Sequence, residues 1–117
     1  MVDIKDFQEI MGEDLSGVTF VRDYLQLQFN PPLILKAYTP VTVHCGDRTA
    51  CFGEPIFPNL LIGQLNKVVC GVEMRPADAI KIMFKDGSTI SVSLRPEHYV
   101  GPEAINLFRK NGEMIVA

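Results

Sequence analysis

The side chains that come closest to a metal site in this sequence are one histidine and the cysteines near it. His44, Cys45 and Cys51 lie close together in the chain, with Cys70 more distant. Zinc sites usually leave two to four residues between paired ligands, and the gap from Cys45 to Cys51 is wider. In an alternating strand, His44 and Cys45 would point to opposite faces. We therefore expect packing cysteines and predict no metal ion and no other cofactor.

Nucleophilic catalysis has little more support from the residue spacing. A cysteine thiolate could pair with His98, but the imidazole would have to lie beside the thiol and be oriented by a third group. Ser88, Ser91 and Ser93 fall on the expected outer face of a hairpin, and the sequence has no Gly-x-Ser-x-Gly elbow. The glycines form neither a P-loop nor a dinucleotide motif. We predict no catalytic residue; the sequence leaves enzyme activity open and favours a protein without it.

The densest polar and aromatic group is Arg95, Glu97, His98 and Tyr99. One interpretation is a turn that caps a following helix. The other is a recognition patch for a protein partner or a small ligand. These four residues are the candidate site that the sequence offers.

The stretch from Ala79 to Leu94 is typical of one β-hairpin, because apolar and polar residues alternate on both sides of Asp86-Gly87. A two-residue loop would leave each face half apolar. A three-residue loop that ends at Gly87 pairs Ile82 with Ile90 and makes one face wholly apolar, with glycine at the left-handed position of a bulged turn. We expect the bulged turn, since burial of each large side chain contributes roughly 1.5–3 kcal/mol. That face comprises Ile80, Ile82, Phe84, Ile90, Val92 and Leu94.

A second hairpin is expected around Asn30-Pro31-Pro32. Counting these three residues as the connection pairs Leu27 with Leu35 and again gives one apolar face, namely Leu25, Leu27, Phe29, Leu33, Leu35 and Ala37. Similar glycines precede both hairpins, and a proline follows each. We interpret residues 10–40 and 61–96 as an internal duplication; the simpler alternative is that all hairpins alternate in this way.

Shorter elements complete the expected fold. Residues 3–11 have the pattern of an N-terminal helix capped by Asp3, and residues 102–110 that of a C-terminal helix that begins at Pro102. Further strands are expected at 41–45, 49–52 and 114–116. The predicted fold class is β-rich α+β in a single domain, 1–117. Two related three-stranded antiparallel units would bury their apolar faces against each other in a small sandwich or a partly open barrel, with short N- and C-terminal helices.

Composition narrows the class of protein. The chain has 117 residues, 47% hydrophobic and 21% charged, with a net charge of −3. No cluster of lysine and arginine is present, which argues against nucleic acid as a partner, and no apolar run is long enough to span a membrane. The first residues lack the pattern of a signal peptide, so we expect a cytoplasmic protein with reduced thiols.

A segment near the C-terminus resembles the C-terminal part of small uncharacterised bacterial proteins, some of which look like neighbours of toxin–immunity systems. The residues that carry this resemblance are Phe84, Asp86, Gly87, Leu94, Pro96, Glu97, Tyr99, Gly101, Pro102, Glu103 and Ala104. The resemblance covers about a fifth of the chain and is structural: a hairpin, a turn and the start of a helix. It implies no catalytic residue and points to a bacterial cytoplasmic binding protein.

The expected outer faces carry Tyr24, Ile34, Tyr38 and Met83. If these side chains gather, they would form a protein-binding patch or a contact between two copies of the chain; alternatively the terminal helices cover them. The sequence therefore favours a non-catalytic protein-binding module, immunity-like or regulatory, that binds a protein partner or itself. The alternative is a small ligand-binding protein or enzyme with its site in the mouth of a barrel.

Overall fold

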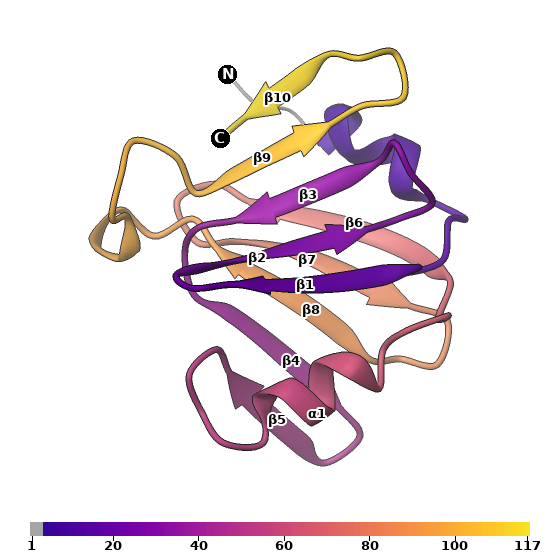
Figure 1. Ribbon diagram of the computed structural model, residues 1–117, viewed down its shortest axis with the longest axis vertical. Coiled ribbons are helices and arrows are strands. Elements are labelled where there is room, and N and C mark those ends of the chain that lie inside the picture. Colours follow the sequence, from indigo (N-terminus) through magenta and orange to yellow (C-terminus); the bar gives the residue numbers. More distant parts are fainter. Residues whose placement is uncertain (1–3) are drawn as a thin grey trace.

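The protein is a sandwich of two five-stranded antiparallel sheets, seen in a computed structural model that describes residues 4–117 (Figure 1). Sheet 1 has the order β1-β2-β3-β9-β10, and sheet 2 has the order β5-β4-β8-β7-β6. The strands are β1 (Gly17–Val21), β2 (Tyr24–Gln28), β3 (Ile34–Ala37), β4 (Val41–Cys45), β5 (Arg48–Cys51), β6 (Val69–Arg75), β7 (Ala79–Phe84), β8 (Thr89–Ser93), β9 (Ile105–Phe108) and β10 (Met114–Val116). The β-rich α+β class and the sandwich are confirmed. The predicted alternative, a partly open barrel, is wrong, because the two sheets share no strand.

Both hairpins have the predicted register. Leu27 lies opposite Leu35 in the β2-β3 pair, and Ile82 lies opposite Ile90 in the β7-β8 pair. The second turn is the bulged one: Phe84 and Ser88 are linked by a backbone hydrogen bond of 2.9 Å, and Gly87 has a φ of 91°. The apolar faces of both hairpins belong to one core, in which Leu27 and Ile82 are fully buried.

The two halves of the chain complete each other's sheets. In the first half, β1, β2 and β3 form a meander in sheet 1, and the hairpin β4-β5 then crosses to sheet 2. In the second half, the meander β6-β7-β8 lies in sheet 2, and the hairpin β9-β10 crosses to sheet 1. Each predicted three-stranded unit is therefore extended by two strands from the other half. This repeated order suits a duplication of residues 10–40 and 61–96, which stays a prediction.

The predicted C-terminal helix is wrong. Residues 105–108 form β9, which pairs antiparallel with β3 and so covers an edge that would otherwise have unpaired backbone groups. Ile105 and Leu107 point into the core beside Ala37 and Leu35. The apolar residues here fit a strand, in which every second side chain faces the core, as well as they fit a helix. The strand forms because the edge of β3 is otherwise unpaired. The predicted last strand is confirmed as β10.

The helical segments are short. The 3₁₀-helix η1 (Ile4–Ile10) buries Phe7 and Ile10, and apolar residues three apart suit its three residues per turn. Asp3, its predicted cap, lies outside the described residues. Helix α1 (Phe57–Ile62) packs on β4 and β5, and its buried Phe57 contacts the ring of Phe20 on β1. A third segment, the 3₁₀-helix η2 (Pro96–His98), lies between β8 and β9. Among the described residues, no helix has the length and apolarity to cross a membrane.

Because the two halves share one core, buried side chains from each half should stabilise the whole domain. Leu27→Ala and Ile82→Ala each remove a fully buried side chain and should lower the free energy of unfolding by about 2–5 kcal/mol in urea denaturation. Gln26→Ala, on the outer side of β2, is the matched control and should change it by less than about 0.5 kcal/mol. A loss below about 1 kcal/mol for either core variant would contradict a single core.

Candidate binding surface

An aromatic pair lies at one end of the outer face of sheet 1. Tyr24 is the first residue of β2, and Tyr38 directly follows β3. Because Leu25 pairs with Ala37, these tyrosines face each other across the two strands, with ring centroids 5.0 Å apart and planes inclined by 43°. The side-chain amide of Asn106, on β9, donates a hydrogen bond of 3.0 Å to the Tyr38 hydroxyl. The phenol proton of Tyr38 is then available for another acceptor.

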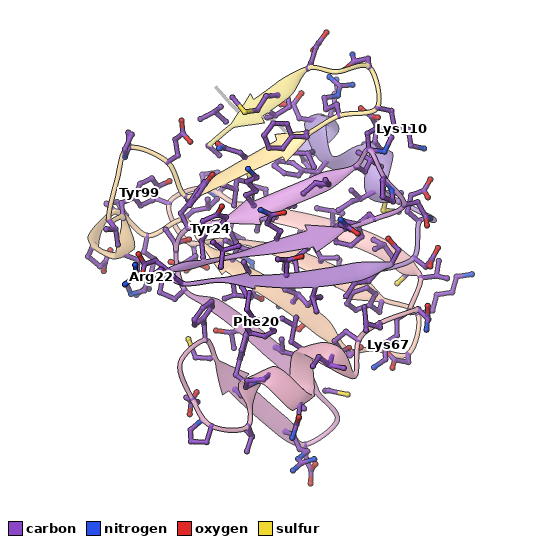
Figure 2. The ribbon with its side chains drawn as sticks, viewed as in Figure 1. Phe20, Arg22, Tyr24, Lys67, Tyr99 and Lys110 are labelled. Carbon is purple, nitrogen blue, oxygen red and sulfur yellow. The ribbon has the colours of Figure 1, made fainter. Side chains whose placement is uncertain are left out.

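The connection between β8 and β9, residues 94–104, turns this pair into a hollow. The backbone N–H of Tyr38 donates to the carbonyl of Ala104 at 2.8 Å, which fixes the end of the connection beside β3. The hollow has a volume of about 650 Å³, and its lining is formed by Asp23, Tyr24, Tyr38, Val100, Gly101, Pro102 and Glu103. Figure 2 shows Tyr24 at the end of the sheet near the connection that carries Tyr99, while Lys67 and Lys110 lie at the opposite end of the molecule.

Carboxylates and phenols set the electrostatics of the hollow. Burial raises the pKa of Tyr38 above that of a free phenol, and the nearby Tyr24 and Glu103 act in the same direction, against the hydrogen bond from Asn106. Tyr38 is therefore neutral at pH 7 and keeps its proton. Asp23 and Glu103 supply the charged groups of the lining, which contains no lysine or arginine.

The rest of this outer face is almost free of charge. Among the strand residues that the structure describes, sheet 1 contains no aspartate or glutamate, and its one cation, Lys36, lies 5.1 Å from the ring centre of Phe108. Ile34, Phe108 and Met114 form a row of apolar neighbours across three strands. The outer face of sheet 2 is different, since it carries mainly hydroxyl and charged side chains: Thr42, His44, Glu73, Lys81, Thr89, Ser91 and Ser93.

The expected outer residues therefore gather only in part. Tyr24, Ile34 and Tyr38 share the outer face of sheet 1, and no C-terminal helix covers them. Met83 lies on sheet 2, where its side chain packs over Gly71. A large uncharged surface with aromatic side chains and charged residues at its ends is typical of a binding surface.

The predicted recognition patch is divided by the fold. Arg95 and His98 line a second hollow, of about 430 Å³, on the outer side of sheet 2. The Arg95 guanidinium also lies 3.4 Å from Asp78, and Glu97 is an exposed neighbour at 4.0 Å. Tyr99 is partly buried against the core. The predicted patch lies in the connection between the two sheets. The part of this connection that lines the aromatic hollow is the segment after Tyr99, residues 100–103.

His98 and Ser93 are joined by a hydrogen bond of 2.6 Å between Nδ1 and Oγ. The tautomer of the imidazole decides which of the two groups donates, and the Ser93 oxygen also accepts the backbone N–H of Arg95 at 3.1 Å. A catalytic arrangement would need a third group on the other ring nitrogen. Within the described residues no such acceptor for His98 is found, so this pair serves to hold the turn after β8.

The cysteines are free and separated. Cys45 and Cys51 are partly buried, and Cys70 is exposed. His44 is exposed on β4 while Cys45 packs against the core, so they do point to opposite faces. In the part of the chain that the structure describes, no three histidine, cysteine or acidic side chains are grouped closely enough to hold a metal ion.

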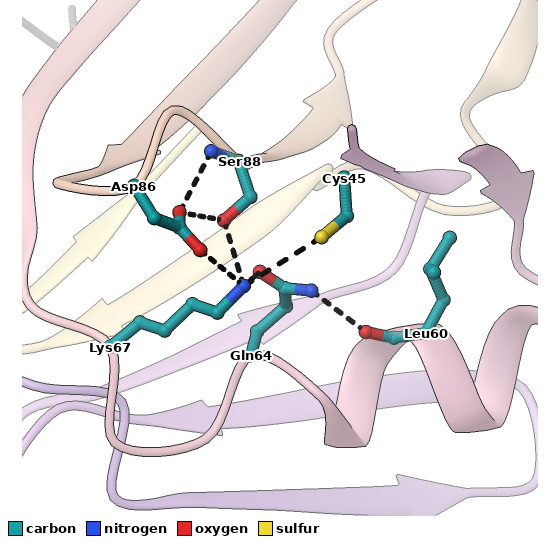
Figure 3. Close-up of polar contacts among 6 residues, drawn as sticks. All are labelled: Cys45, Leu60, Gln64, Lys67, Asp86 and Ser88. Carbon is teal, nitrogen blue, oxygen red and sulfur yellow. Dashed lines mark hydrogen bonds and ion pairs between the residues drawn. The ribbon is translucent and has the colours of Figure 1, made fainter. Parts of the chain in front are cut away.

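Lys67, which the sequence did not single out, lies at the centre of a polar network (Figure 3). The ammonium of Lys67, in the segment between α1 and β6, lies 2.7 Å from Asp86, 2.9 Å from Gln64 and 3.2 Å from Ser88. Ser88 also donates to Asp86 at 2.6 Å and is buried, so the expectation that it lies on an outer face is wrong. These contacts fix the β7-β8 turn to the segment between α1 and β6.

Acidic residues in η1 and just after it have a similar structural role. Glu9 forms an ion pair and hydrogen bond with Arg109, which lowers the pKa of the Glu9 carboxyl. Hydrogen bonds from Asn30 and then Lys110 lower the pKa of Glu13. These pairs connect η1 to the β2-β3 and β9-β10 turns, at the end of the molecule away from the hollow.

One signal in the sequence could have located the aromatic hollow. The predicted register pairs Leu25 with Ala37, so the next pair outward is Tyr24 with Tyr38. Both are predicted to lie on an outer face, and extension of the register by one pair places them directly opposite each other. The contribution of Val100 to Glu103 had no comparable signal, because it depends on the backbone bond between Tyr38 and Ala104.

The fold and its hollow define a small β-sandwich with one open, largely uncharged face. Comparison with protein-family models, with curated proteins and with solved structures gives no match. Such a face can bind another surface by apolar and aromatic contact, and the two carboxylates of the hollow can accept hydrogen bonds from a donor.

The Lys67 network predicts loss of stability in acid. Hydrogen bonds from Lys67 and Ser88 hold the pKa of Asp86 well below its usual value of 3.8. The unfolded chain binds this proton at higher pH, so the stabilisation is present above about pH 4 and is lost as the pH falls through the folded pKa. Lys67→Met should lower the free energy of unfolding by about 1 kcal/mol at pH 7 and flatten its slope below about pH 4. Lys81→Met, on the outer side of β7, is the control; an unchanged slope in the Lys67 variant would refute the assignment.

Asn106 predicts a stabilising substitution next to the hollow. The side chain is buried at 8% exposure, and its Oδ1 has no hydrogen-bond partner among the described residues. An unpaired buried carbonyl costs about 1–3 kcal/mol, and valine suits a strand. Asn106→Val should therefore raise the free energy of unfolding by about 1 kcal/mol. It should also raise the pKa of Tyr38 further, measured by ultraviolet titration, because Asn106 no longer donates to the phenol. Destabilisation of more than about 1 kcal/mol would contradict this account.

Proposed function

We propose that the protein is a non-catalytic protein-binding module, immunity-like or regulatory in role, that recognises a protein partner through the outer face of sheet 1. The observation that carries this proposal is the face itself: five strands without a carboxylate, with an aromatic pair and a hollow at one end. Interfaces are depleted of charge at their centre and enriched in tyrosine, phenylalanine and methionine. Tyr24, Tyr38, Phe108 and Met114 supply these residue types here.

The net charge supports a basic partner. The chain carries 14 acidic and 11 basic residues, and opposite charge on a partner would raise the rate of association. Three free cysteines suit a cytoplasmic protein in a reducing compartment.

Site-specific photocrosslinking in cells of the native host tests the proposal. A benzoylphenylalanine at Ile34 reports on the outer face of sheet 1, and one at Thr89 reports on sheet 2. We expect a discrete adduct from position 34 that is at least about tenfold stronger than from position 89, since an interface buries one patch of surface. The adduct is identified by mass spectrometry and its binding measured with the purified partner by calorimetry.

Two outcomes would overturn the proposal. Equal labelling from both faces, or none from position 34, would show that sheet 1 is not a binding face. An adduct that contains a second copy of this chain, with a dimer in size-exclusion chromatography and light scattering, would replace the protein partner with self-association. Ile34→Lys should abolish the adduct formed by a crosslinker at Gln26 on the same face, while Thr89→Lys should leave it unchanged.

A further inference from the structure

The aromatic hollow combines three features that select one kind of ligand group. Two phenol rings offer flat faces, Val100 and Pro102 offer apolar contact, and Asp23 and Glu103 offer negative charge. We propose that the hollow binds a basic side chain, arginine by preference, presented by the protein partner. This inference rests on the proposed function and names the chemistry of its central contact.

Aromatic faces attract cations. A guanidinium placed over a tyrosine ring interacts with the negative face of the ring, and its planar shape allows it to stack. The rings of Tyr24 and Tyr38 are inclined by 43° and both line the hollow, so a flat group could lie against one ring while it touches the edge of the other. The methylene stem of the same side chain would then lie against the apolar part of the lining.

The two carboxylates of the lining favour a positively charged ligand group in the hollow. Asp23 belongs to the β1-β2 turn, and Glu103 comes just before β9. No cationic side chain lines the hollow, and the adjacent Arg22 is not part of its lining. An anionic group such as a phosphate would meet these two charges without compensation, whereas a guanidinium can form charge-assisted hydrogen bonds with them. Tyr38, which is neutral at pH 7, adds no charge of its own.

Val100 gives a further indication that a partner covers the site. It is 94% exposed, while the other exposed large apolar side chains between residues 4 and 117 reach at most 48%. An aliphatic side chain held in water beside an aromatic hollow gains contact area when a partner segment covers it. Val100 therefore lies where the stem of an inserted arginine, or its neighbouring residues, would meet the surface.

Titration with small arginine derivatives tests the inference. The probe is N-acetyl-arginine-methylamide, followed by ¹H–¹⁵N chemical shifts of the full chain at constant ionic strength. We expect saturable shifts at Tyr24, Tyr38, Val100, Gly101 and Glu103, with a dissociation constant of roughly 1–10 mM. The citrulline derivative keeps the shape without the charge and should bind at least about fivefold more weakly. The leucine derivative tests whether apolar contact alone is enough for binding, and it should bind as weakly as the citrulline derivative.

Variants locate the binding. The double substitution Asp23→Asn and Glu103→Gln should weaken arginine binding about tenfold, and Tyr24→Leu should weaken it about fivefold. Glu97→Gln removes an exposed carboxylate of the same connection outside the hollow and is the matched control, with no expected effect. Unfolding curves confirm that each variant is folded. Equal binding of arginine and citrulline, equal binding of leucine, or shifts outside the hollow would overturn the inference.

The result is separable from the proposed function. Failure of arginine binding with an intact adduct from position 34 refutes the basic side chain and leaves sheet 1 as the binding face. Failure of that adduct with selective arginine binding refutes the face as the docking surface for a protein and retains the hollow as a cation site.

Discussion

The structure depends on the mutual burial of two apolar sheet faces. Each meander, β1-β2-β3 and β6-β7-β8, has one face of large aliphatic and aromatic side chains that cannot remain in water. The crossing hairpins strengthen this dependence, because β4-β5 completes the sheet of the second half and β9-β10 completes the sheet of the first. Neither half can satisfy its backbone edges and bury its apolar face alone. The sandwich is one cooperative unit for this reason.

The inner faces of both sheets are buried in the core, whereas their outer faces differ in the residue types that they carry. Sheet 2 carries hydroxyl groups and both signs of charge, as an ordinary solvated face does. Sheet 1 carries amides, tyrosines and a row of apolar residues, and its acidic neighbours lie only in the turns and connections at its ends. The segment of residues 94–104 passes between the sheets at one such end, and there it closes the side of the hollow. The arrangement of the site is thus a result of the crossing that completes sheet 1.

The fold can be predicted from the sequence where a local rule and burial in the core favour the same structure. The registers of both hairpins follow from the requirement that Leu27, Leu35, Ile82 and Ile90 share one interior, and the glycine of the second turn agrees with it. Residues 105–108 could not be predicted in this way, because their apolar pattern fits both a helix and a strand. They form a strand because the edge of β3 is unpaired without them. The hollow needed tertiary knowledge as well, because the Tyr38–Ala104 hydrogen bond joins segments that are distant in the chain. The predicted patch at Arg95 to Tyr99 precedes the hollow in the chain; Arg95 and His98 lie on the outer side of sheet 2, and Tyr99 packs against the core.

The exchange of hairpins between the halves also governs how the chain is completed during synthesis. When the first half leaves the ribosome, β4 has no β8 to pair with, and β3 lacks β9. Contacts of this kind join residues far apart in the chain, and they form late and slowly. The nascent protein therefore carries an open apolar layer until β8 and β9 have emerged. A holdase that shields such a layer would act on this chain chiefly before those two strands are available.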